Sequence, residues 1–130
     1  MPCLTHIALH VKDVSRCVLF YQRYAGLEIV RDRHVNGKHI IWLAESGKGD
    51  QFIFVLLPGG PGHQQSSVDF SHLGFALSSK HEVDKVAQMA KKEDILLWPP
   101  KQEDFPVGYY CGVLDPDGNR VEFSFGQPLG

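Results

Sequence analysis

Two histidines and one glutamate in this 130-residue sequence have the types and spacing to bind a metal ion. The segments THIALHV and SHLGFAL, which begin 66 residues apart at Thr5 and Ser71, each place a histidine between a hydroxyl residue and a mostly apolar run. A third segment, DPDGNRVEF, reads as a turn followed by a strand that contains a glutamate. Imidazole and carboxylate groups bind Fe(II), Mn(II), Zn(II) and Ni(II) in proteins. We therefore take His6, His72 and Glu122 as candidate metal ligands.

Alternation of side chains along a strand is expected to turn these three candidates away from the core. Each of them alternates with apolar residues in its own segment. The residues expected in the core from the same three strands are Ile7, Leu9, Val11, Leu73, Phe75, Leu77, Val121, Phe123 and Phe125. A single histidine or glutamate in such a position is usually a solvated surface residue. The metal-site hypothesis therefore depends on the coincidence of three such residues.

The elements that must position these residues occur twice in one order, a strand, a helix and three strands. The first helix is predicted between Asp13 as the N-cap and Gly26 as the C-terminal stop. The second begins near Ser79, which forms an S-x-x-E capping box with Glu82. The remaining strands are predicted at Leu27–Arg33, Lys38–Ala44, Gln51–Leu57, Ile95–Trp98, Tyr109–Leu114 and Arg120–Phe125. Each half of the chain is therefore expected to be a βαβββ module.

The segment PGGPGHQQSS, residues 58–67, separates the two modules. Its glycine, proline and polar residues interrupt regular structure and are typical of a linker. We therefore predict one domain, with module one at residues 1–57 and module two at residues 68–130.

The composition argues against several classes of partner. Thirteen Lys and Arg against fifteen Asp and Glu give a formal charge of −2, and the basic residues are scattered instead of forming the stripe that nucleic acid favours. No apolar stretch approaches the ~20 residues of a membrane span, and the N-terminal residues lack a signal-peptide pattern. Three cysteines without a CxxC pair fit a reducing compartment. We expect a cytoplasmic protein without nucleic-acid or membrane partners.

Taken together, the double module and the segments HIALHV, HLGFAL and DPDGNRVEF resemble the vicinal oxygen chelate superfamily. This superfamily includes glyoxalase I, extradiol dioxygenases, fosfomycin-resistance enzymes and bleomycin-resistance proteins, and the resemblance covers nearly the whole chain. It implies an α+β fold in which the sheets of the two βαβββ modules pair into a cupped, incomplete barrel. It also implies that a metal ion inside the cup is bound by His6, His72 and Glu122.

The sequence departs from the pattern of this superfamily at one metal ligand. Many glyoxalase I enzymes carry a fourth ligand, a glutamate, at the end of the first module. The repeat offset places the equivalent of Glu122 at Leu56, in the strand QFIFVLL, where Gln51 alone could ligate a metal. Two histidines and one carboxylate are the ligand set of non-haem Fe(II) oxygenases. The resemblance therefore favours an extradiol-dioxygenase-like enzyme with Fe(II), or with Mn(II), Zn(II) or Ni(II), acting on a small substrate with neighbouring oxygens. The alternatives are a glyoxalase I-like lyase, a fosfomycin-resistance-type thiol transferase and a metal-free, bleomycin-resistance-like binding protein.

The candidates for further acid, base or substrate contacts are Tyr109, Tyr110, His10 and His39. Because Tyr109 and Tyr110 are consecutive, only one of them can face a cavity. The remaining histidines, His34, His63 and His81, are expected to be exposed to solvent. The resemblance further implies a homodimer, with each site built within one chain or from two chains.

Overall fold

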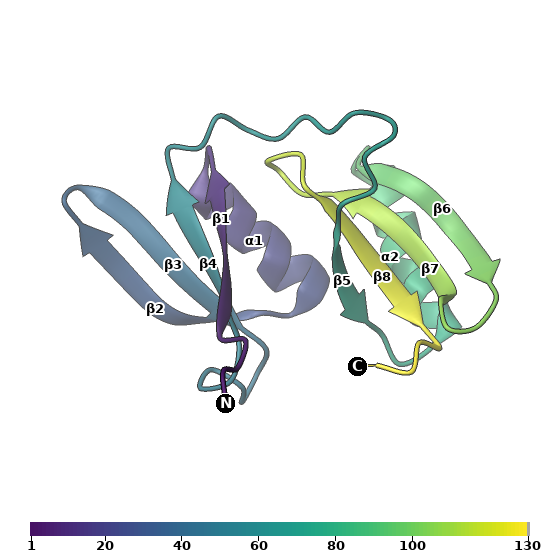
Figure 1. The fold of residues 1–130 in the computed structure, drawn as a ribbon. Helices are drawn as coiled ribbons and strands as arrows, with labels where there is room; N and C mark the ends of the chain where they lie inside the picture. The colour runs from purple at the N-terminus through teal and green to yellow at the C-terminus, as the bar shows by residue number, and fades with distance from the viewer. Residues whose placement is uncertain (130) are drawn as a thin grey trace. The chain divides into compact units, whose positions relative to one another are not determined.

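The computed structural model describes residues 1–129, which form two compact units, Met1–His63 and a second unit that begins at Gln64 (Figure 1). Each unit contains one helix and one four-stranded sheet. The boundary between the units falls inside the segment predicted as a linker. None of the helices in the described residues is long and apolar enough to cross a membrane.

The first unit follows the predicted order of elements. These are β1 (His6–Val11), α1 (Val14–Ala25), β2 (Glu28–Val35), β3 (Lys38–Ala44) and β4 (Ile53–Pro58). The sheet order is β1-β4-β3-β2, with β1 parallel to β4 and the other pairs antiparallel. The Asp13 carboxylate accepts a hydrogen bond from the Arg16 backbone N–H, and Gly26 ends α1 in the left-handed conformation, so both predicted caps are confirmed.

The second unit repeats the first. Its elements are β5 (Leu73–Ala76), α2 (Lys80–Lys92), β6 (Leu96–Glu103), β7 (Gly108–Leu114) and β8 (Arg120–Phe125). The sheet order is β5-β8-β7-β6, with β5 parallel to β8. The Ser79 hydroxyl caps α2 by accepting a hydrogen bond from the Glu82 N–H. The Glu82 carboxylate accepts hydrogen bonds from the N–H and hydroxyl of Ser78, so the return half of the predicted capping box goes to Ser78 and not to Ser79. The prediction of two βαβββ modules is confirmed.

Strand β6 is longer than predicted, because it continues past Trp98 to Glu103. Pro99 and Pro100 lie inside it, although proline cannot donate a hydrogen bond to a neighbouring strand. Edge strands tolerate such residues, and β6 is the edge of its sheet, with an irregular register against β7 between Trp98 and Lys101. The prolines therefore distort the strand without ending it.

Each unit has its own buried core, and two of the residues predicted for these cores are exposed. Val11, Val121 and Phe123 are fully buried, as expected. Ile7, on the edge strand β1, is 39% exposed, and Phe125, at the last position of β8, is 36% exposed. Both lie at a margin of their sheet, where fewer neighbouring side chains cover them.

Candidate metal centre

His72 and Glu122 lie together in the second unit, with His72 Nε2 3.8 Å from Glu122 Oε1. Glu122 lies in β8 between two glycines, Gly74 of β5 and Gly112 of β7, which are its partners in the strand register. Neither neighbour has a side chain that could cover the carboxylate, and a Cβ at Gly74 would be 3.7 Å from Glu122 Oε2. The carboxylate is therefore buried by the sheet but open toward His72.

The hydrogen bond of the other His72 nitrogen determines what Nε2 can do. His72 Nδ1 is 2.6 Å from the backbone carbonyl oxygen of Phe70, which can only accept, so Nδ1 carries the hydrogen. In the neutral ring, Nε2 then has a lone pair, and it faces the lone pairs of the Glu122 carboxylate. Two electron-pair donors that face each other in this way can bind one positive ion between them. The donor set fits a divalent metal ion.

His72 precedes β5, whereas the sequence predicted it inside a strand. The segment that carries it is attached to β8 through Arg120, whose guanidinium donates to the backbone carbonyl oxygens of Asp69 and Ser66. The Asp69 carboxylate accepts from the Ser71 N–H at 3.0 Å, and this hydrogen bond holds the pKa of Asp69 below its ordinary value. Arg120 and Glu122 are two residues apart, so β8 both supplies the carboxylate and fixes the segment that carries the histidine.

A cavity of about 600 Å³ opens beside this pair. Its lining residues are Phe70, His72, Trp98, Pro99, Lys101, Val107, Tyr110, Glu122 and Gln127. Tyr110 is thus the tyrosine of the consecutive pair that faces the cavity. Tyr109 points elsewhere and donates to Asp84 of α2 at 2.5 Å, and this hydrogen bond raises the pKa of the Tyr109 hydroxyl.

Two lining residues that touch the candidate ligands were missed by the sequence analysis. Trp98 packs edge-on against the His72 ring, with the ring centroids 5.7 Å apart. Gln127 Nε2 donates to Glu122 Oε2 at 3.4 Å. Gln127 follows the last strand and belongs to no periodic pattern, so the sequence contained no signal for it. Trp98 lies at the end of the predicted strand Ile95–Trp98, but no sequence pattern connects it with His72.

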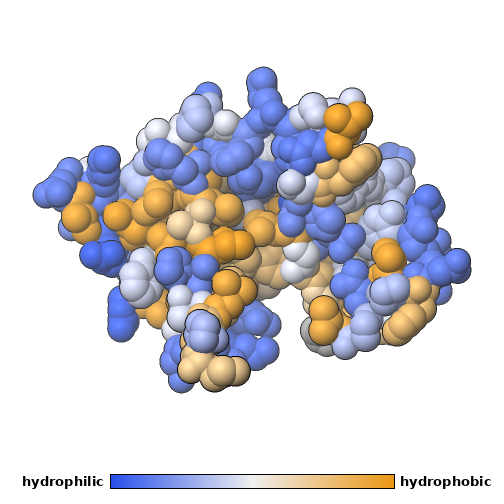
Figure 2. All heavy atoms as spheres, in the orientation of Figure 1, coloured by the Kyte–Doolittle hydropathy of each residue, from blue (hydrophilic) through white to orange (hydrophobic). Residues whose placement is uncertain are grey.

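His6 belongs to the first unit and lines a cavity of about 490 Å³ on one face of that sheet. Its Nδ1 is 2.9 Å from the Thr5 hydroxyl oxygen. The surrounding face is largely apolar, as the orange area over the first sheet in Figure 2 shows. Arg33 adds a positive charge to the lining, and its guanidinium lies 5.7 Å from the centroid of the Trp42 ring. The joint role of His6, His72 and Glu122 remains a prediction.

The position of the first sheet that corresponds to Glu122 is Val55, one residue from the predicted Leu56. Ala8 pairs with Val55 in the β1–β4 register, as Gly74 pairs with Glu122 in the β5–β8 register. Val55 lines the cavity of the first unit. The first sheet therefore presents an apolar side chain where the second sheet presents a carboxylate.

Two other candidates lie in different surroundings. His10 Nε2 is 2.9 Å from the carbonyl oxygen of Pro58, at the end of β4. His39 Nε2 is 2.6 Å from Asp32 Oδ1, and its ring stacks on His34. His39 thus lies in a separate cluster, and His34 is exposed as expected but is part of that cluster.

The model of the Glyoxalase/Bleomycin resistance protein/Dioxygenase superfamily matches residues 4–123 of this sequence. The chain belongs to this superfamily. An uncharacterized protein of Pseudomonas aeruginosa is 50% identical over 129 residues, which cover 99% of this chain and 92% of that protein.

Solved structures of the superfamily share this fold. A mutant of the fosfomycin resistance protein FosX of Listeria monocytogenes, complexed with Mn(II) and 1S,2S-dihydroxypropylphosphonic acid, matches with a TM-score of 0.77 at 18% identity, covering 98% of this chain and 95% of FosX. A possible glyoxalase of Bacillus cereus matches with a TM-score of 0.68 at 27% identity, covering 94% and 97%. The trypanothione-dependent glyoxalase I of Leishmania major matches with a TM-score of 0.71 at 20% identity, covering 97% and 88%. The predicted family and fold class are confirmed.

Proposed function

We propose that this chain is a metal-dependent enzyme that binds a small substrate through two neighbouring oxygen atoms. The divalent ion would be held by His6, His72 and Glu122. The observation that supports this most strongly is the approach of His72 Nε2 to Glu122 Oε1, 3.8 Å apart, with the histidine tautomer fixed by a backbone carbonyl. A ligating histidine usually donates its other ring N–H in this way.

The residues around this pair suit such chemistry. A divalent ion polarises adjacent substrate oxygens and stabilises the negative charge that develops on them. The Tyr110 hydroxyl lies in the same cavity and can donate a proton to a substrate oxygen or accept one. Phe70, Trp98 and Val107 form apolar walls, and the exclusion of water strengthens the electrostatic interactions inside.

Among the reactions of the superfamily, we propose extradiol-type oxygenation with Fe(II) as the first candidate. A set of two histidines and one carboxylate leaves coordination positions for a bidentate substrate and for O₂. The apolar Val55 at the position equivalent to Glu122 supports this set, because it leaves the first sheet without the fourth ligand of many glyoxalase I enzymes.

A fosfomycin-resistance-type reaction is the second candidate. The observation that favours it is the match to FosX, whose structure contains Mn(II) and a vicinal dihydroxy phosphonic acid. Arg33 lines the cavity beside His6, and Lys101, whose ammonium group pairs with Glu103 at 2.8 Å, lines the cavity beside Glu122. Both cavities therefore contain a cation that could bind an anionic substrate group, although Lys101 would have to exchange Glu103 for it.

An activity screen with defined metals separates these candidates. Apo protein is loaded anaerobically with Fe(II), Mn(II), Zn(II) or Ni(II) and assayed for oxygen uptake with catechols, opening of fosfomycin by water or thiols, and isomerisation of a hemithioacetal. We expect oxygen uptake with Fe(II), its loss in Glu122→Gln, and its retention in the control Glu93→Gln, an exposed carboxylate at the end of α2. Absence of every activity and of metal, with ligand-induced thermal stabilisation, would instead identify a metal-free binding protein.

We also propose that the chain forms a homodimer. Strands β1 and β5 each form one of the two edges of their sheet. Ile7 of β1 exposes apolar surface at its edge, which favours association with another chain. Mixing of His6→Ala chains with Glu122→Ala chains tests how the site is built. Recovery of metal binding in the mixture would show that each site takes residues from two chains, whereas no recovery would show a site within one chain.

A further inference from the structure

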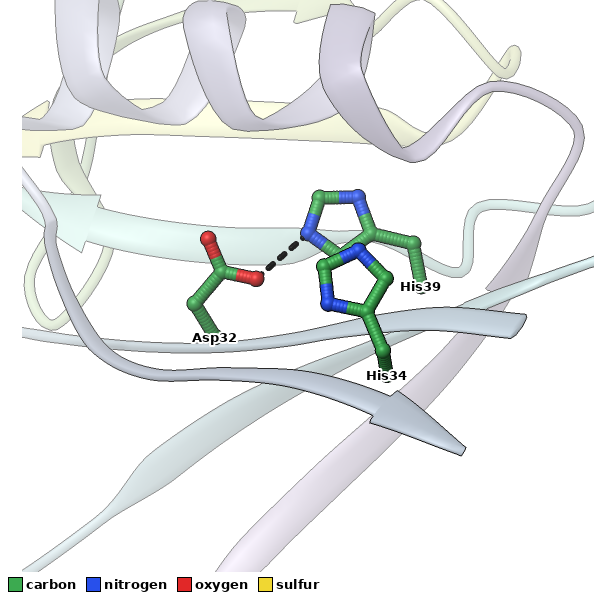
Figure 3. Close-up of side chains that lie close together, drawn as sticks. All are labelled: Asp32, His34 and His39. Atoms are coloured by element: carbon green, nitrogen blue, oxygen red, sulfur yellow. Dashed lines mark hydrogen bonds and ion pairs between the residues drawn. The ribbon is translucent and has the colours of Figure 1, made fainter. Parts of the chain in front are cut away.

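The β2–β3 hairpin carries a second group of metal-binding side chains, Asp32, His34 and His39 (Figure 3). One ligand atom from each residue lies within 4.8 Å of the corresponding atoms of the other two. The group contains two imidazoles and one carboxylate, the donor types that Zn(II), Ni(II) and Cu(II) prefer.

The sequence of the hairpin fixes these three side chains on one face. Asp32 and His34 are two residues apart in β2 and therefore point to the same side, and His39 of β3 pairs directly with His34 in the register. The connection is the two-residue turn Asn36-Gly37, whose φ angles of 51° and 75° are both positive. Such turns fix the register of a hairpin. The hairpin therefore holds the three side chains on one face before any ion binds.

This face differs from the face of the candidate catalytic site. Arg33 lies between Asp32 and His34 and points to the opposite side, where it lines the cavity of His6. His39 instead shares its side of β3 with Ile41, which is buried in the core. A metal ion at the hairpin would therefore be independent of the ion proposed for the enzyme reaction.

Without an ion, a hydrogen bond and ring stacking hold the cluster together, and an ion would replace both contacts when it binds. His39 Nε2 and Asp32 Oδ1 are 2.6 Å apart, as the dashed line in Figure 3 shows. The rings of His34 and His39 stack with centroids 4.5 Å apart and an interplanar angle of 5°. The side chains of His39 and Asp32 are 37% and 54% exposed, so an ion can reach them from solvent. Binding would release any proton shared by His39 and Asp32, because ligands bind metals in their deprotonated form.

We infer that Asp32, His34 and His39 form a second metal-binding site, selective for Zn(II) and similar transition-metal ions over Mg(II) and Ca(II). Two imidazole ligands disfavour the hard cations, which require oxygen ligands. The site leaves part of the coordination sphere open to water on the surface of the hairpin.

Zinc titration of untagged protein tests this inference. The Glu122→Ala variant serves as the parent protein for all measurements, because this substitution weakens the site proposed at His6, His72 and Glu122. We expect one Zn(II) per chain by isothermal titration calorimetry, and binding at least about tenfold weaker in His34→Ala and in His39→Ala. His81→Ala is the matched control, since it removes an exposed histidine outside the cluster and should leave binding unchanged.

Imidazole NMR resonances add a second readout that does not depend on affinity. Zn(II) should shift the ring signals of His34 and His39 and leave those of His81 in place, and Asp32→Asn should weaken the same effect. The inference would be overturned if the Glu122→Ala chain bound no zinc, or if it bound zinc equally well with and without His34 and His39. Neither result would bear on the enzyme proposal, which depends on residues of a different face.

Discussion

Tyr109 and Tyr110 are consecutive residues whose hydroxyl groups have different roles. Tyr109 donates to the Asp84 carboxylate, whereas Tyr110 lines the cavity of His72 and Glu122. We expect Tyr109→Phe to lower the free energy of unfolding by about 1.5–3 kcal/mol, because it removes a hydrogen bond to a charged group. Tyr110→Phe should change stability by less than about 0.5 kcal/mol and should lower turnover.

Urea unfolding and steady-state kinetics of the two variants check this division of roles. Each tyrosine serves as the control for the other, because both substitutions remove only one hydroxyl oxygen. The assignment would be wrong if Tyr109→Phe lost turnover at unchanged stability.

Cys111 makes the stability of the fold sensitive to alkaline pH. Burial, with the negative charge of Asp84 and Glu122, raises the pKa of the Cys111 thiol from 9.0 to about 12. The unfolded chain releases this proton near pH 9 and the folded chain keeps it to about pH 12, so rising pH favours the unfolded state in this window. We expect the free energy of unfolding to fall from pH 9 upward, and to fall less steeply in Cys111→Ala. Urea unfolding at about pH 8 and about pH 10.5 measures both slopes, and equal slopes would contradict the assignment.

At the scale of residues, the sequence predicted those side chains that follow strand periodicity. Regular alternation in its strand predicted that Glu122 points away from the core residues Val121 and Phe123. The same alternation limited the tyrosine that faces a cavity to either Tyr109 or Tyr110. Gln127 and Arg120 could not be recognised in the same way. Gln127 lies after the last strand, and Arg120 acts on backbone carbonyls of a distant segment that has no periodic pattern.

Strand β7 depends on a glycine to accommodate the tryptophan beside the candidate ligand. A Cβ at Gly112 would lie 2.2 Å from the ring of Trp98, which packs against His72. We therefore expect Gly112→Ala to displace this ring and to lower the free energy of unfolding by about 1–3 kcal/mol, the usual effect of overpacking.

The matched control for this substitution is Gly74→Ala in β5 of the same sheet. A Cβ at Gly74 would meet its nearest atom at an ordinary 3.7 Å, so this variant should be at least as stable as the native protein. Thermal and urea unfolding compare the two, and tryptophan fluorescence reports on the displacement of Trp98. Equal stability of the two variants would show that the ring adapts without strain.

At the scale of elements, local signals predicted both helices and most strands. The N-caps Asp13 and Ser79 marked the helix starts, because their side-chain oxygens satisfy backbone N–H groups that the helix leaves free. The end of β6 was missed because consecutive prolines usually end a strand, and only its place at the sheet edge permits Pro99 and Pro100.

The molecule as a whole repeats one module but not its chemistry. The two sheets share the same strand order, and Ala8–Val55 pairs in the first as Gly74–Glu122 pairs in the second. The repeat was visible in the sequence, whereas the equivalence of Val55 required the strand register. The first module contributes one histidine to the proposed site, and the second contributes a histidine and the carboxylate.

The metal content of the purified protein tests the proposed site most directly. Untagged protein is purified without chelators, with His34→Ala in every chain so that the hairpin cluster contributes little, and is analysed for transition metals. We predict about one divalent ion per chain in the parent, nearly complete loss in Glu122→Gln, and retention in Glu93→Gln, because Glu122 faces His72 and Glu93 lies at the end of α2. Full metal occupancy in Glu122→Gln, with the fold intact by circular dichroism, would contradict the assignment of Glu122 as a ligand.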